Sequence, residues 1–117
     1  MTKTNPADVV RDYNRALQAK DFARARGFLA DDLRFEGPID RFEKADDYIA
    51  AIQRLYGMVS GVEEDGTLTD GDEVALFTVL KTPMANAPVA EWYTVRADRI
   101  THLRVYFDAR PFAPRAG

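Results

Sequence analysis

The chain contains no cysteine among its 117 residues, which excludes a disulfide framework and any thiolate metal site. Its single histidine, His102, argues against a metal site built from several histidines. Lysine and arginine number 16 against 19 acidic residues, so no global positive field is present to attract nucleic acid. We therefore expect no metal and no nucleic-acid partner.

Long hydrophobic runs and targeting patterns are also lacking. No stretch is apolar enough to cross a membrane, and residues 1–10 lack the apolar run of a signal peptide. No phosphate loop, nucleophile elbow or metal signature is present, so the sequence predicts no cofactor. Hydrophobic residues nevertheless make up 46% of the chain. We expect one soluble, cytoplasmic domain spanning residues 1–117, with residues 111–117 as a flexible tail and no membrane partner.

Capping residues and hydrophobic spacing predict three helices. The first begins at Asn5, which can cap it, and buries a stripe that includes Tyr13. A short second helix is capped by Asp21, and a third begins near Asp46 and ends at Gly57.

The other segments alternate in hydrophobicity as strands do. The expected strands are residues 33–36, 59–69 with a bulge, 74–81, and a closing pair within 89–108 that turns at 97–98. A turn is expected at residues 31–32, the end of the first strand at 37–38, and loops at 39–44 and 83–88. Helices followed by antiparallel strands predict an α+β fold, with three N-terminal helices packed on a curved, mostly antiparallel sheet.

Alternation along residues 89–95 places Glu91 on the same face as Tyr93 and two valines. A carboxylate on an apolar face is costly unless it has a partner or holds its proton. Glu91 is therefore a candidate for chemistry. The alternative is that Glu91 lies near a strand end, solvated or paired with an arginine.

The second face of the sheet carries apolar and aromatic groups that nothing in the chain covers. The residues expected there are Phe77, Trp92, His102 and Tyr106. An uncovered face of this kind is an aggregation hazard, so we predict a homodimer through it.

Several short segments, in this order and spacing, resemble the SnoaL-like branch of the nuclear transport factor 2 superfamily. They are Val9–Val10 with Tyr13 and Leu17, Lys20–Phe22, Phe28–Asp32, Arg99–Ile100 and Val105–Asp108. The resemblance implies a cone-shaped half-barrel with a pocket between sheet and helices. The family hosts isomerases, dehydratases, cyclases and epoxide hydrolases, so the fold does not settle the function.

Two branches of the family suggest roles for single residues. By resemblance to ketosteroid isomerases, Tyr13 matches the tyrosine that binds the substrate oxyanion, and Glu91 falls at or beside a protonated acid. Their general base falls at Gly37 here, and the neighbouring Glu36 should point away from the pocket. The catalytic aspartate of limonene epoxide hydrolases falls at Val105, which disfavours that reaction.

The candidate catalytic residues are therefore Tyr13 and Glu91, with Asp40 either a displaced base or a solvated loop acid. Tyr13 is otherwise a core tyrosine. The expected ligand-binding residues are Leu17, Phe35, Phe42, Tyr48, Ile52, Tyr56, Met58, Tyr93, Val105 and Phe107.

Three functions remain open from the sequence. The first is a pocket protein for a small, mostly apolar ligand, acting as a cofactor-free isomerase, dehydratase or cyclase. The second is a non-catalytic carrier of such a ligand, and the third is a dimeric interaction module with a filled cavity.

Overall fold

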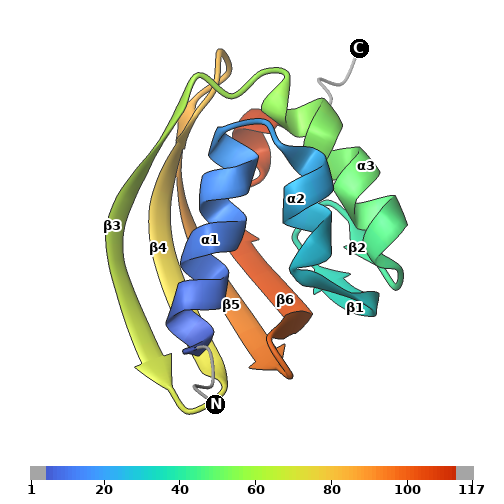
Figure 1. Cartoon of the computed structure of the whole chain (residues 1–117). Helices are drawn as coiled ribbons and strands as arrows, with labels where there is room; N and C mark the ends of the chain where they lie inside the picture. Colours follow the sequence, from blue (N-terminus) through green and yellow to red (C-terminus); the bar gives the residue numbers. More distant parts are fainter. Residues whose placement is uncertain (1–4, 113–117) are drawn as a thin grey trace.

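The computed structural model describes residues 5–112. In chain order the elements are α1 (Pro6–Gln18), α2 (Phe22–Gly27), β1 (Leu29–Glu36), β2 (Arg41–Phe42), α3 (Ala45–Tyr56), β3 (Gly61–Asp70), β4 (Glu73–Lys81), β5 (Asn86–Arg96), β6 (Arg99–Phe107) and the 3-10 helix η1 (Arg110–Phe112). The helices lie on one face of a curved sheet (Figure 1). The predicted α+β class is confirmed.

The six strands form one open sheet in the order β2-β1-β6-β5-β4-β3. All neighbouring pairs are antiparallel except β1 and β6, which run parallel. The stripe of α1, which includes Val10, Tyr13 and Leu17, is buried in one core with Tyr93 of β5 and Leu103 of β6. This packing holds α1 over the inner face of the sheet.

The closing hairpin has the predicted turn and the predicted alternation. Ala97 and Asp98 have φ values of 51° and 62°, the left-handed conformation that tight hairpin turns use. Across β5 and β6, Glu91 pairs with Val105, so both side chains lie on the inner face.

The turn predicted at residues 31–32 is wrong, because β1 already begins at Leu29. The backbone nitrogen of Ile100 donates to the carbonyl of Phe28 at 2.8 Å, and Leu29 then pairs with Ile100. The register shifts between Leu29 and Arg34, and the exposed Asp31 and its neighbour lie within this irregular stretch. Pairing with a strand some 70 residues later therefore extends β1.

Two predicted loops are shorter than expected. The segment 39–44 contains the short strand β2, which pairs with β1. The loop 83–88 ends where β5 begins at Asn86. Pro88 is tolerated within β5 because pairing with β6 starts only at Val89, so this part of β5 has a neighbouring strand on one side only. The bulge predicted in residues 59–69 is confirmed by the register shift in β3 between residues 64 and 66.

Of the tail predicted over residues 111–117, the structure describes residues 111 and 112. Residues 110–112 form η1, and the ring of Phe112 packs edge-on against Phe107 with centroids 5.7 Å apart. Residues 113–117 lie outside the described part of the chain. Within residues 5–112, no helix has the length and apolar character needed to cross a membrane.

Candidate functional site

A cavity of about 330 Å³ lies between the helices and the inner face of the sheet. This volume is at the lower end of the range for small-molecule sites, about 300–1,000 Å³. All the lining residues expected from the sequence do line it, except Tyr93. Tyr93 is fully buried, and its hydroxyl contacts a residue that does line the cavity. The walls are mainly aromatic and aliphatic.

The carboxyl group of Glu91 opens onto this cavity from the middle of β5. It accepts hydrogen bonds from the hydroxyl of Tyr93 and from Thr78 Oγ1, the latter at 3.2 Å. Withdrawal from water raises the pKa of Glu91, and the two hydrogen bonds oppose that rise because they favour the carboxylate. Both hydrogen-bond partners of Glu91 are neutral hydroxyl groups, so no arginine offsets the effect of burial on its pKa.

Asn14 donates to the hydroxyl of Tyr93, and the hydrogen of that hydroxyl is in turn donated to Glu91. Its Nδ2 atom lies 2.9 Å from the carbonyl oxygen of Val10 and 3.2 Å from the hydroxyl of Tyr93. A carbonyl oxygen can only accept, so the side-chain atom facing Val10 must be the amide nitrogen. The Tyr93 hydroxyl therefore accepts from Asn14 and donates to Glu91. We call this arrangement the Asn14–Tyr93–Glu91 chain.

A second polar point in the cavity is formed by Tyr13 of α1 and Tyr48 of α3, whose hydroxyl oxygens are 2.7 Å apart. One hydroxyl donates to the other, which leaves one hydrogen free to bond a ligand oxygen. Burial raises the pKa of both phenols, so both remain neutral donors. The structure thus places Tyr13 and Glu91 on the same cavity but gives each its own hydrogen-bond partner.

The loop between β1 and β2 forms part of the cavity rim. Asp40 is exposed there, and its carbonyl oxygen accepts from the backbone nitrogen of Gly37 at 2.9 Å. A Cβ atom added at Gly37 would lie 3.1 Å from Cζ of Phe35. The position that the resemblance assigns to an isomerase base therefore has no room for a side chain unless Phe35 moves.

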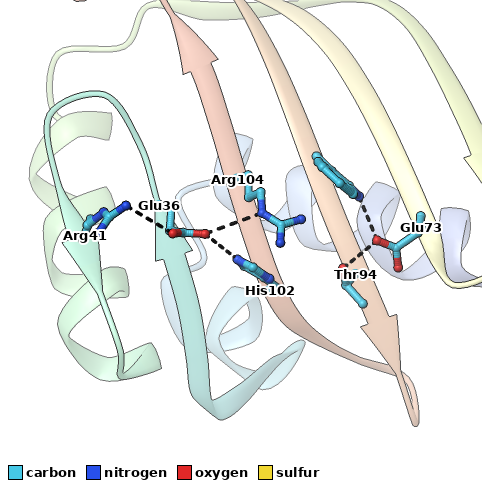
Figure 2. A network of polar contacts seen from close by, with 7 residues as sticks. Glu36, Arg41, Glu73, Thr94, His102 and Arg104 are labelled. Carbon is cyan, nitrogen blue, oxygen red and sulfur yellow. Dashed lines mark hydrogen bonds and ion pairs between the residues drawn. The ribbon is translucent and has the colours of Figure 1, made fainter.

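The outer face of the sheet carries a separate polar network (Figure 2). His102 Nε2 lies 2.8 Å from Glu36 Oε2, and Arg104 and Arg41 flank the same carboxylate at 3.5 and 3.4 Å. The hydrogen bond from His102 is the main reason that the pKa of Glu36 is lowered. Arg104 also stacks over the ring of Trp92, 4.2 Å from its centroid. As predicted, Glu36 and His102 point away from the cavity.

The sequence interpretation missed Asn14 and Thr78 as members of the site. Asn14 is one helical turn beyond Val10 and is buried, so an amide lies on an apolar helix face. Thr78 continues the inner face of β4 that Val74 and Leu76 begin. A polar residue on an otherwise apolar face was the signal available in both cases.

Comparison with known proteins gives consistent matches over most of the chain. A family model described as a SnoaL-like domain matches residues 10–103. A Kribbella flavida protein of known structure is 31% identical, covers 90% of this chain and 88% of its own, and superposes with a TM-score of 0.85.

Two further solved structures are similar. An NTF2-like protein from Cytophaga hutchinsonii is 23% identical, with 95% of this chain and 96% of its own covered and a TM-score of 0.84. An LEH-like epoxide hydrolase from M. tuberculosis is 26% identical, with coverage of 89% and 83% and a TM-score of 0.74. No curated protein sequence matches the chain.

Proposed function

The chain belongs to the SnoaL-like family, and from this premise we propose that it is a cofactor-free proton-transfer enzyme for a mostly apolar carbonyl or hydroxyl compound. The observation that carries the proposal is the placement of Glu91 on an apolar cavity that the Tyr13–Tyr48 pair also lines. An isomerase, dehydratase or cyclase of this kind needs a group that moves a proton and a donor that holds the substrate oxygen.

In the proposed reaction, the carboxylate of Glu91 takes a proton from a carbon next to the substrate carbonyl. The electron pair of the broken C–H bond forms a carbon–carbon double bond, and the carbonyl π electrons move to the oxygen. The free hydroxyl hydrogen of the Tyr13–Tyr48 pair bonds this enolate oxygen. Glu91 then returns the proton to another carbon, so the enzyme is regenerated without a co-reactant.

The Asn14–Tyr93–Glu91 chain supports the role of Glu91 as the base. Because Tyr93 donates to Oε1, that oxygen is already occupied as an acceptor. The other oxygen, Oε2, has only the 3.2 Å contact with Thr78 and is assigned as the atom that exchanges the proton. Burial raises the pKa of Glu91, which makes its carboxylate a stronger base than a solvated glutamate.

The other functions considered have less support. An interaction module was expected to have a filled cavity, whereas the cavity here is about 330 Å³. Epoxide hydrolysis of the limonene type is disfavoured because Val105 lines the cavity where the resemblance requires an aspartate. Experiment can distinguish a carrier from an enzyme, because a carrier binds its ligand without exchanging protons with it.

Deuterium exchange of β-tetralone in heavy water, followed by proton NMR, tests the proposal. This neutral bicyclic ketone has acidic hydrogens next to its carbonyl group. Glu91→Gln should slow exchange by about 100-fold or more, as expected for loss of a general base. Tyr13→Phe combined with Tyr48→Phe, which removes both hydroxyls of the pair, should slow it by about 100-fold through loss of the oxyanion donor.

Asp98→Asn is the matched control, because it removes one acidic charge at the exposed turn between β5 and β6. It should leave the exchange rate unchanged. Wild-type rates in both Glu91→Gln and the double variant Tyr13→Phe with Tyr48→Phe would overturn the catalytic proposal. Binding of the ketone without any exchange in the wild type would favour the carrier.

A further inference from the structure

We propose that the cavity selects uncharged compounds and rejects anionic ones, so that the substrate carries no carboxylate or phosphate within it. This inference rests on the proposed function and names the substrate class of the same site. Among the described residues that line the cavity, none is lysine, arginine or histidine. Within residues 5–112, the only carboxyl groups in the lining are those of Glu91 and the rim residue Asp40.

An anion inside this cavity would lose its hydration without gaining a cationic partner. Apart from Glu91 and Asp40, the polar side chains that line the cavity are neutral, namely Tyr13, Asn14, Tyr48, Tyr56 and Thr78, and the hydroxyl of Thr78 already donates to Glu91. Burial of an unpaired charge in such surroundings is strongly unfavourable. The carboxylate of Glu91 adds like-charge repulsion, and Glu64 of β3 contributes negative potential at Glu91 as well.

The cationic side chains on the neighbouring strands are on the opposite side of the sheet. Arg104 and His102 project from β6 to the outer face, where both contact Glu36, and Arg41 of β2 does the same (Figure 2). On its other face, β6 presents Val105 and Phe107 to the cavity. These cations therefore contact an outer-face acid, and none of the three lines the cavity.

An uncharged carbonyl compound suits the same groups. Its oxygen can accept the free hydrogen of the Tyr13–Tyr48 pair, while its carbon skeleton lies against the apolar walls. A ketone needs one good donor, whereas a carboxylate needs several donors or a cation to replace its hydration.

Acetylnaphthalene and naphthoate form a matched pair of probes for this inference, because they share a ring system and differ mainly in charge. Their dissociation constants for the purified protein can be measured by calorimetry at pH 8. The wild type should bind acetylnaphthalene at least tenfold more tightly than naphthoate. Glu91→Gln should reduce this preference at least threefold, whereas Asp98→Asn, which removes the same charge at an exposed turn, should retain it.

Equal affinity of the wild type for the two probes would overturn the inference, and so would an unchanged preference in Glu91→Gln. These outcomes are separable from failure of the proposed enzyme. If selectivity is seen but β-tetralone exchanges no deuterium, the catalytic proposal fails and the charge selection stands. If exchange depends on Glu91 but naphthoate binds as tightly as the ketone, the charge selection fails and the catalytic proposal stands.

Discussion

Replacing Tyr93 by phenylalanine is a direct test of the Asn14–Tyr93–Glu91 chain. The substitution removes one hydroxyl and keeps the fully buried ring, which packs edge-on against Tyr13 with centroids 6.2 Å apart. Two hydrogen bonds are lost, one from Asn14 to Tyr93 and one from Tyr93 to Glu91. The shape of the core is otherwise preserved.

The expected magnitudes follow from the charge on Glu91. A hydrogen bond to a charged group contributes about 1.5–3 kcal/mol to stability, and a neutral one about 1 kcal/mol. When Glu91 is charged, Tyr93→Phe should therefore lower the free energy of unfolding by about 2.5–4 kcal/mol. When Glu91 is protonated, the loss should be about 2 kcal/mol. Because the charged form loses more, the pKa of Glu91 should rise further in this variant.

Carbon-13 NMR of the glutamate side-chain carboxyl carbons measures the titration of Glu91 directly, and urea unfolding on either side of its midpoint measures the two stability losses. Tyr13→Phe is the matched control, because that hydroxyl bonds Tyr48 and not Glu91. A pKa of Glu91 that stays the same or falls in Tyr93→Phe would refute the proposed direction of the chain.

Three further predictions concern stability and assembly. Because burial raises the pKa of Glu91, the folded protein holds this proton more tightly than the unfolded chain. The wild type should therefore lose stability relative to Glu91→Gln as pH rises from the ordinary glutamate pKa through the pKa in the folded protein. If the unfolding free energies of the two proteins, measured in urea, change with pH in parallel, this prediction is wrong. Gly37→Ala should lower the free energy of unfolding by about 1–3 kcal/mol, because the added Cβ would press on the ring of Phe35. An unchanged unfolding free energy in urea would show that this ring moves aside freely. We also propose that the outer sheet face, where Phe77 and Tyr106 are 38% and 54% exposed, is a homodimer surface. Tyr106→Glu should convert the dimer to a monomer in analytical ultracentrifugation. A wild type that is monomeric at micromolar concentration would refute the proposal.

The orientation of Glu91 could be predicted from the sequence because it depends on a local rule. Strand alternation has a period of two, so the valines and tyrosine around Glu91 place it on the buried face once the strand is recognised. The helix beginning at Asn5 was predictable for a similar reason: its side chain accepts from the backbone nitrogen of Ala7, two residues away.

The pairing of distant segments could not be predicted in the same way. β1 begins at Leu29 because Ile100 pairs with it, and β2 exists because Phe42 pairs with Phe35. Two exposed acids in β1 resemble a turn when only neighbouring residues are considered. A strand of weak local propensity is stable when a partner strand satisfies its backbone groups.

The sequence by itself determined the helix starts, the main strands and the face on which Glu91 lies, because capping and alternation act between residues a few positions apart. Only the tertiary structure decided the partners within the cavity. Tyr13 meets Tyr48 from 35 positions away and Asn14 meets Tyr93 from 79, contacts that exist because α1 packs across the sheet. The hydrogen-bond partners of a buried acid depend on this packing, and with them the chemistry that we propose for it.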